Sequence, residues 1–414
     1  MSEASLADRT IEHVRTWIDP SRAPQSRPDQ ERPKTASPKT TSTDEPVALA
    51  HLANDPAAVD FVVQFIDLVI RPEDPATAAR HLKRLTRDLP AFLSPGERRK
   101  LRAGGRFARM SPEFVQNRAR KTLREMLGRL VLDARPDQLS KAIADLTRSG
   151  DRLNVSLLGE AVLGEEQAVR HRDNVIALVG RQDVDYVSVK VSSIASQLSL
   201  WSFDATVDRV VERLAPVLAE AAAKDTFVNL DMEAYRDVDL TVAVFMRALD
   251  RYPDLAAGIA LQAYLPDSLA HLQEIQEWAA ARVAGGGAPV KVRIVKGANL
   301  SLEQVDSSLH GWPAPTWPTK RETDTHFKRM LHWALEPERV ANVRVGVATH
   351  NLFDVAYAWH LAGDHDVRDL VEFEVLHGFD EGPMGAVRQD VGPLRLYTPV
   401  VHEEEFDAAI AYLV

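Results

Sequence analysis

The segment Val290-Lys291-Val292-Arg293-Ile294-Val295-Lys296-Gly297-Ala298-Asn299 has the pattern of a buried β-strand that ends at a glycine. Its β-branched residues alternate with other residues at nearly the period of a strand. Gly297 ends the run at a point where another group could approach the backbone closely. Arg293 and Lys296 are unusual in a strand interior unless an anionic or strongly polar group lies beside them. Salt-bridged or snorkelling side chains at a strand end are the alternative interpretation.

Seven further segments of the C-terminal two thirds of the chain have the same strand-like character. Helical patterns separate them, as in residues 165–179, 203–224 and 268–283. Eight strands alternating with helices over about 260 residues predict a (β/α)8 barrel of the TIM type. A doubly wound open sheet is the alternative, which we disfavour because no glycine-rich dinucleotide turn follows a strand. The strand candidates are residues 154–158, 184–191, 227–231, 258–263, 290–296, 343–349, 371–376 and 394–397.

The N-terminal third divides into two parts. Residues 1–46 combine a short helical pattern with a tract of proline, serine, threonine and charges, which predicts a flexible linker. Residues 47–148 are helical in periodicity throughout and predict an all-helical arm of four to six helices, with helix starts at Asp55-Pro56 and at Ser94-Pro95-Gly96-Glu97. The barrel would then occupy residues 149–414.

Composition limits the class of protein. The 414 residues carry a formal net charge of -10, so binding nucleic acid is not expected to be the main function. Cysteine is absent, which rules out disulfides and a cysteine nucleophile and fits a cytoplasmic protein. No secretory signal and no apolar run of about 18 residues is evident, although contact with a membrane surface stays open.

Polar residues follow the apolar run of every predicted strand. In a (β/α)8 barrel the carboxyl ends of the strands meet at one face, so these residues predict one shared pocket. A structural hydrogen-bonding role is the alternative for each residue taken singly. The residues are Glu160, Lys190, Asp231, Glu233, Gln262, Tyr264, Arg293, Lys296, Thr349, His350, Asn351, His377, Gly378, Arg395 and Tyr397.

The types of residue in this predicted pocket narrow the chemistry. The chain has neither the HExxH metal motif nor a GxSxG nucleophile elbow, and His350 and His377 lie beside amide or glycine residues, so we predict no metal. The remaining cations, amides and hydroxyls suit an anionic or electron-rich cofactor that carries the difficult chemistry itself. Arg293 and Lys190 would favour the reduced, anionic form of a flavin.

The strand-end segments resemble those of the flavin-dependent proline dehydrogenase barrel, in the same order. Together with the helical arm, residues 50–414 resemble the N-terminal half of the bifunctional proline utilization A family. The motifs are LLGEA (157–161), VSVKVS (187–192), NLDME (229–233), LQAY (261–264), VRIVKGA (292–298), ATHN (348–351), FEVLHG (373–378) and LYTPV (396–400).

This resemblance implies oxidation of L-proline to 1-pyrroline-5-carboxylate by hydride transfer to FAD, the first step from proline to glutamate. It places Lys190, Asp231 and Arg293 in catalysis. The implied substrate contacts are Glu160, Lys190, Asp231, Tyr397 and Tyr412. The implied FAD contacts are Gln262, Arg293, Val295, Gly297, Thr319, Lys320, Thr349, His350, Asn351 and Leu376.

Two departures from the family pattern stand out. Asn299-Leu300 replaces an aromatic pair that part of the family has after Lys-Gly-Ala. The sequence also stops at Tyr412-Leu413-Val414, where the family continues into two arginines that grip the substrate carboxylate. We therefore expect this chain to bind proline weakly, because bidentate arginine contacts to a carboxylate are strong.

The resemblance also implies partners. A quinone would reoxidise the flavin, and an aldehyde dehydrogenase module or separate enzyme would take the product. An under-covered last helix would favour association into a homo-oligomer. Two other functions stay open: a flavin-binding scaffold or regulatory remnant with little turnover, and a barrel aldolase that uses Lys190 or Lys296 as a Schiff base.

Overall fold

The structure is a computed structural model of the chain, and it describes residues 5–19, 56–90, 93, 95–107, 111–127, 131–159, 162–378, 381–402 and 405–406. The chain forms two compact units. The first comprises Met1–Ile18, Pro136–His377 and Asp390–Val400. The second comprises Asp19–Arg135, Gly378–Gln389 and Val401–Val414.

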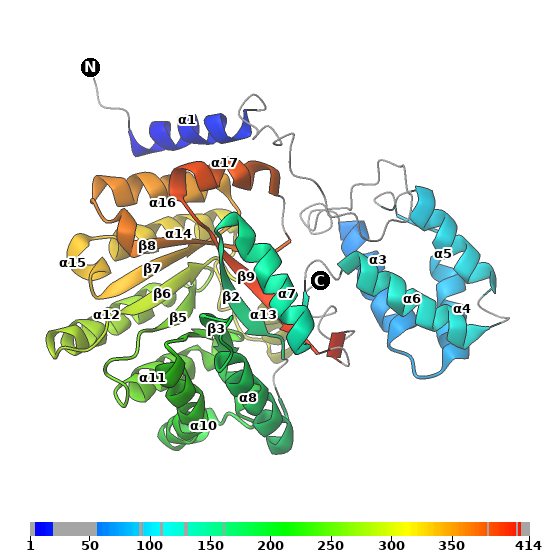
Figure 1. Cartoon of the computed structure of the whole chain (residues 1–414), viewed down its shortest axis with the longest axis horizontal. Coiled ribbons are helices and arrows are strands. Elements are labelled where there is room, and N and C mark those ends of the chain that lie inside the picture. The colour runs from blue at the N-terminus through cyan, green and yellow to red at the C-terminus, as the bar shows by residue number, and fades with distance from the viewer. Residues whose placement is uncertain are drawn as a thin grey trace. The chain divides into compact units, whose positions relative to one another are not determined.

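The first unit contains a closed barrel of eight parallel strands (Figure 1). Each strand pairs with the next one along the chain, and the last strand pairs with the first, which closes the sheet. The prediction of a (β/α)8 barrel is confirmed. The strands are β2 (Arg152–Leu157), β3 (Tyr186–Lys190), β4 (Phe227–Asp231), β5 (Ala257–Gln262), β6 (Val290–Val295), β7 (Val343–Ala348), β8 (Val371–Leu376) and β9 (Arg395–Val401).

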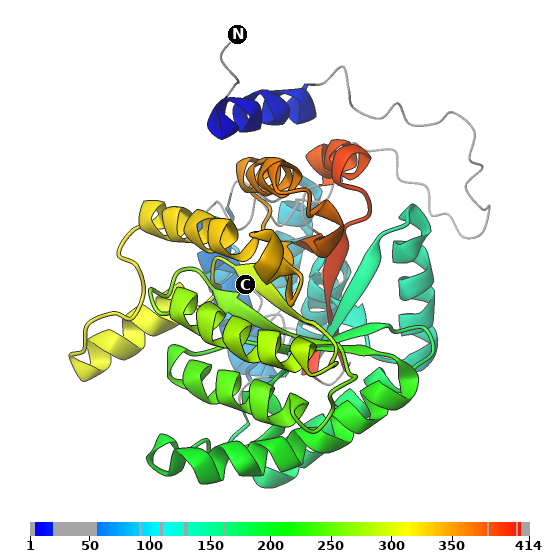
Figure 2. The ribbon, with the colours of Figure 1, turned by 90° about the vertical axis from the view of Figure 1, so that its left-hand side faces the viewer.

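Helices surround the strands, as the green, yellow and orange ribbons of Figure 2 show. From β2 onward, at least one helix lies between each barrel strand and the next one along the chain. The main helices are α7 (Pro136–Leu146), α8 (Glu165–Val179), α10 (Phe203–Lys224), α11 (Val238–Leu249), α12 (Ser268–Ala284), α13 (Leu300–His310), α14 (Lys320–Ala334) and α16 (Leu352–Asp364). The shorter elements are α9 (Val191–Ile194), α15 (Pro337–Val340), η3 (Thr147–Ser149), η4 (Leu200–Ser202), η5 (Tyr235–Asp237) and η6 (Arg368–Leu370).

The two faces of the barrel sheet differ in chemistry. Val228 and Leu230 of β4 point outward, where they share a small apolar hollow with Leu214 of α10 and Phe245 of α11. Asn229 and Asp231, which alternate with them along β4, must point inward, because successive side chains of a strand alternate between faces. Asp231 meets a side chain from β6, which is not a neighbour of β4 in the sheet. The interior of the barrel is therefore lined by polar residues and the exterior by apolar ones.

The helical pattern near the N-terminus forms α1 (Leu6–Ile18), which lies along α16 (Figures 1 and 2). Val14 and Trp17 are buried. Arg9 pairs with Asp364 of α16 at 2.5 Å, and the indole Nε1 of Trp17 donates to Asp390 at 2.6 Å. The predicted flexible linker after this helix lies outside the described residues, apart from residue 19.

The described part of the second unit is largely helical. Gln116 joins two segments of this unit that are distant in sequence. Its side-chain amide donates to the carbonyls of Val69 and Pro72 at 3.2 and 2.7 Å. Asp55 and Ser94, the predicted helix caps, lie outside the described residues, whereas Asp74 caps a helix through the amides of Ala76 and Thr77. The elements are α3 (Pro56–Phe65), the π-helix η2 (Ile66–Ile70), α4 (Pro75–Leu85), α5 (Pro95–Phe107), α6 (Pro112–Leu127), β1 (Leu132–Asp133) and most of α17 (Glu381–Val391).

One predicted strand end is wrong. Arg395 begins β9 rather than ending it, since the strand runs on to Val401. Pro399 obscures this in the sequence, because proline has no N–H to donate and normally marks the edge of a sheet. Arg395 consequently lies deep in the barrel, where its Nε donates to Glu372 at 2.8 Å, and not at the carboxyl end of the strands.

Candidate active site

The centre of the site is Asp231, at the end of β4. Its Oδ2 accepts the hydroxyl proton of Tyr397 at 2.9 Å, and its Oδ1 lies 3.3 Å from a terminal nitrogen of Arg293. Asn229 donates to the same Oδ1 at 2.8 Å. Asp231 and Tyr397 come from β4 and β9, which are not neighbours in the sheet, so these two side chains meet inside the barrel as predicted, although Tyr397 lies within β9 and not at its end.

Arg293 of β6 is held on several sides. Its Nε donates to Glu374 of β8 at 2.7 Å, and its guanidinium lies 4.7 Å from the centre of the Tyr397 ring. Burial disfavours the charge, but Glu374 and Asp231 outweigh burial and raise the pKa of Arg293. Burial, followed by Asp231, raises the pKa of Tyr397 well above its ordinary value. The site therefore presents a permanent cation beside a neutral phenol.

Lys190 of β3 belongs to a second group at the same end. Its Nζ lies 3.2 Å from Oε1 of Glu233, whose other oxygen accepts from Ser192 at 2.5 Å. The backbone carbonyl of Glu233 accepts from the amides of Gln262 at 3.4 Å and Asn299 at 2.8 Å. Glu233 thus ties Lys190 to the last residue of β5 and to a residue that follows β6.

Gly297 follows β6, and its backbone conformation and surroundings explain why this position is a glycine. Its φ is +125°, a conformation that other residues rarely adopt. A Cβ at this position would lie 2.5 Å from the ring of Tyr264, so the group that approaches the backbone here is Tyr264. Lys296, one residue earlier, pairs with Asp324 at 2.5 Å and with Asp354 at 2.6 Å.

The segment Thr349-His350-Asn351 links β7 to α16. Asn351 caps the helix through the amide of Phe353 at 2.9 Å, and Thr349 accepts from the amide of Asn351 at 3.1 Å. The Nε2 of His350 accepts from the amide of Leu376 at 2.9 Å, which places the ring proton on Nδ1. Burial lowers the pKa of His350 to about 4, so this ring is neutral at pH 7.

A family model described as proline dehydrogenase matches residues 139–414, which include every strand of this barrel. The chain belongs to the proline dehydrogenase family. The match covers the residues of the site described above, from Lys190 to Tyr397.

The similar proteins include single-function and bifunctional members. Proline dehydrogenase of Deinococcus radiodurans is 25% identical over 292 residues, which cover 69% of this chain and 84% of that protein. The bifunctional protein PutA of Salmonella typhimurium is 26% identical over 306 residues, covering 67% of this chain but 22% of that protein.

Two solved structures extend the comparison. Proline utilization A of Corynebacterium freiburgense is 45% identical, with a TM-score of 0.68, over 72% of this chain and 31% of that one. Proline utilization A of Bdellovibrio bacteriovorus shares the fold at 22% identity, with a TM-score of 0.76 over 99% of this chain and 40% of that one. The chain therefore spans well under half the length of the solved relatives.

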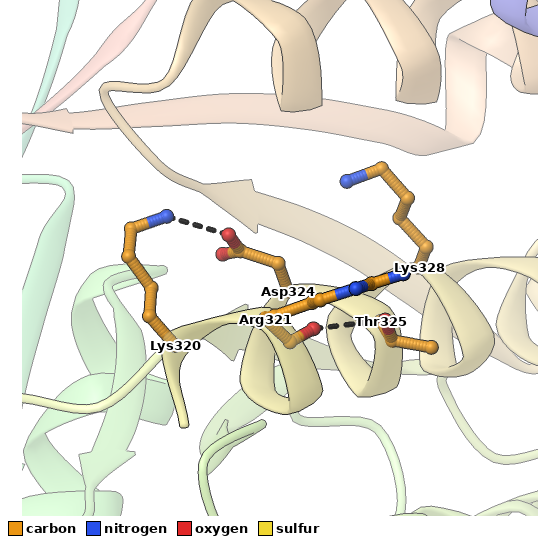
Figure 3. A pocket seen from close by; sticks show the side chains of 5 residues that line it. All are labelled: Lys320, Arg321, Asp324, Thr325 and Lys328. Atoms are coloured by element: carbon orange, nitrogen blue, oxygen red, sulfur yellow. Dashed lines mark hydrogen bonds and ion pairs between the residues drawn. The ribbon is translucent and has the colours of Figure 1, made fainter.

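A second feature of this barrel lies at the start of α14. Lys320, Arg321, Asp324, Thr325 and Lys328 line a pocket of about 420 Å³ (Figure 3). Lys320 pairs with Asp324 at 2.5 Å, and Asp324 also pairs with Lys296, so this pocket adjoins the end of β6. Thr319 caps α14 in a capping box with Glu322, a local structural role that the sequence analysis had not identified.

Two of the predicted site residues fall on parts of the chain that the structure does not describe, and one residue of the site was not predicted from the sequence. Glu160 and Tyr412 lie outside the described residues. Glu374, which holds Arg293, was not among the predicted site residues. Its signal in the sequence is the pair Glu372 and Glu374, two acids on the same face of an otherwise apolar strand, which implies cations opposite them.

Proposed function

We propose that this chain oxidises L-proline to 1-pyrroline-5-carboxylate, with FAD as the hydride acceptor. The observation that carries the proposal is the cluster of Asp231, Arg293 and Tyr397 inside a barrel that the proline dehydrogenase model matches. Proline has a carboxylate, an amine and an apolar ring, so its site needs charged groups of both signs beside an apolar wall. The Lys190–Glu233 pair, Asp231 and the neutral Tyr397 supply these features, and Glu160 and Tyr412 are proposed to complete them.

The residues present fit a flavin. Gln262 is buried, and within the described structure its Oε1 has no hydrogen-bond partner, as expected of a group that waits for a donor. Arg293 supplies a permanent cation, and His350 supplies a neutral imidazole ring. Val295, Gly297, Thr349, Asn351 and Leu376 are proposed to surround the same group. When bound, FAD would supply the acceptor for the hydride, which carries both electrons of the oxidation.

The pocket at the start of α14 is proposed to hold the ribityl or adenylate end of FAD. Lys320, Arg321 and Lys328 give it cationic groups, and its position at a helix N-terminus favours an anion further. Thr319 is proposed to contact the same part. Lys296, which follows the strand that carries Arg293, reaches Asp324 of this pocket, so the pocket adjoins the end of β6.

The barrel residues orient the substrate and exclude water. Tyr397 donates a hydrogen bond to Asp231 and stays neutral, so its ring can form an apolar wall without a competing charge. Lys190, Asp231 and Arg293 are proposed as the catalytic residues, since they set the charges around the bond that loses the hydride. A quinone as final acceptor and an aldehyde dehydrogenase module for the product are proposed on the family resemblance alone. No helix in the described part of the chain is long and apolar enough to cross a membrane.

The structure weakens the aldolase alternative for Lys296. A Schiff-base lysine must be available as a free amine, which usually requires a lowered pKa. Burial disfavours the charge of Lys296, but the hydrogen bonds that Lys296 donates to Asp324 and Asp354 outweigh burial and raise its pKa. Lys296 is therefore held as a paired cation.

The deciding experiment is the visible spectrum of the purified chain loaded with FAD, recorded before and after anaerobic addition of L-proline. We expect the flavin band to bleach with L-proline and to persist with D-proline. The variant Arg293→Lys should bleach roughly 100-fold more slowly, whereas Arg395→Lys, one layer deeper in the barrel, should stay close to the parent rate. A band that never bleaches would favour the scaffold alternative, and a protein that does not bind FAD would refute the flavin assignment.

A further inference from the structure

The interior of the barrel holds a chain of alternating charges that leads away from Arg293. Glu374 binds Arg293 through Oε2 at 2.7 Å and Lys291 through Oε1 at 2.5 Å. Lys291 also binds Glu372, which in turn accepts from Arg395 at 2.8 Å. Glu374 is 1% exposed, so its charge is screened very little by water.

Glu374 has room in the barrel only because residue 346 is glycine. A Cβ at Gly346 would lie 2.5 Å from Oε1 of Glu374 and 2.7 Å from Cε of Lys291. The strand β7 therefore leaves a gap that the Glu374 carboxylate and the Lys291 stem fill together. This packing fixes the carboxylate and, through it, the side of Arg293 that carries Nε.

The described contacts of Arg293 involve three parts of its guanidinium group. Nε is bound by Glu374, one terminal nitrogen faces Asp231, and the ring of Tyr397 lies 4.7 Å from the guanidinium. A planar group fixed on these sides has a defined orientation, which a lysine in its place would lack. Any ligand that Arg293 binds therefore meets a donor whose direction Glu374 has set.

We propose that Glu374 is a positioning residue of the flavin site, which orients Arg293 and offsets part of its charge. This inference rests on the proposed function. A cation beside a flavin favours the reduced, anionic form, and a buried carboxylate at 2.7 Å from that cation opposes this effect. Glu374 therefore holds the reduction potential of the flavin below the value that Arg293 alone would produce.

The test compares Glu374→Gln with Glu372→Gln. The two glutamates lie two residues apart on β8, both bind Lys291, and each accepts from the Nε of one arginine, so Glu372 is a matched control that does not contact Arg293. The potential of the FAD-loaded protein is measured against a reference dye, without proline. We expect Glu374→Gln to shift the equilibrium about tenfold toward reduced flavin, which is ~30 mV for a two-electron couple. Glu372→Gln should shift it less than about threefold. Equal shifts, or a shift toward oxidised flavin, would overturn the inference.

A second measurement needs neither flavin nor proline. In protein labelled with ¹⁵N-arginine, the Nε–H signal of Arg293, assigned by its loss in Arg293→Lys, should move or broaden in Glu374→Gln and persist in Glu372→Gln. The signal of Arg395 should show the opposite response. An Arg293 signal that Glu374→Gln leaves unchanged would refute the positioning role. A flavin that proline cannot bleach would refute only the proposed function, because both measurements on Glu374 would still give their result.

Discussion

Lys291 and Val292 are adjacent on β6 and both are buried, yet they lie on opposite faces of the barrel sheet. Val292, at 0% exposure, faces the helices, where apolar contacts have no preferred direction. Lys291, at 6%, faces the interior, where it needs Glu372 and Glu374 at defined positions. The outer face can therefore tolerate substitutions of similar volume, whereas the inner face requires matched charges. We therefore expect the outer face to supply most of the stability of the barrel, and the inner face to set the geometry of the site.

The substitution Lys291→Met should have the largest effect on stability. It leaves Glu372 and Glu374 with one cation fewer in a buried setting, which is expected to lower the free energy of unfolding by about 3–5 kcal/mol. Val292→Ala on the outer face should cost less, about 1–3 kcal/mol. Urea unfolding of both variants checks the order.

A double variant tests the cause. Lys291→Met combined with Glu372→Gln removes one positive and one negative charge and should recover more than half of the loss. Glu372 has a pKa lowered to about 2 because Lys291 and Arg395 outweigh its burial, so it is charged in the parent protein at pH 7. If the double variant is no more stable than Lys291→Met, unpaired charge is not the reason for the loss.

His350 lies just after the end of β7, and its titration should make the stability of the protein depend on pH. Its pKa in the folded protein is about 4, below the ordinary value of 6.5. The unfolded chain therefore binds more protons between these values, so stability is fully present above pH 6.5 and is lost as pH falls toward 4. The loss should reach up to about 3 kcal/mol.

The variant His350→Asn isolates this contribution. An amide can still accept from the backbone amide of Leu376 but does not titrate. The difference in the free energy of unfolding between parent and variant, followed from pH 7 to pH 4, should shrink with acid. A difference that is constant over this range would show that His350 does not titrate below its ordinary pKa when folded.

The sequence predicted the barrel well because periodicity and strand spacing report the outer face directly. Residues 227–231 and 371–376 were predicted with the bounds that the structure has. The helices α13 and α17 were missed, since neither has a strong apolar periodicity: Leu300 and Leu309 of α13 are exposed, and α17 contains a glycine and a proline in its first turn.

The inner face was harder to predict because its partners are distant in sequence. Arg293 and Lys296 were recognised as cations that need anions, but nothing local shows that Glu374 serves one and that Asp324 and Asp354 serve the other. These pairs depend on which strands and helices face each other across the barrel. The family resemblance implied which residues contact the flavin and the substrate, and only the structure shows which of them are held by carboxylates.

Gly346→Ala should test the inner face by volume alone, without changing a charge. The added methyl group would meet Glu374 and Lys291 at distances that no real side chain tolerates, so their ion pair must shift. We expect a loss of about 2 kcal/mol in the free energy of unfolding, as in other overpacked sites. Gly164→Ala is the control, because a Cβ there has no atom within 4 Å. Equal effects of the two substitutions would contradict the tight packing of the interior.

Arg9→Ala should have the smallest effect, although it removes an ion pair that resembles those of the interior. Arg9 binds both oxygens of Asp364, but their side chains are 35% and 43% exposed. Water and salt screen such a pair, so the expected loss is about 0.5 kcal/mol and should decrease further at high salt. Thermal unfolding at low and high salt measures it, with Arg15→Ala, whose pair with Glu12 lies within α1, as the control. A loss above about 2 kcal/mol in the free energy of unfolding that persists at high salt would contradict this prediction. It would show that the contact between α1 and α16 behaves like the interior of the barrel and not like its surface.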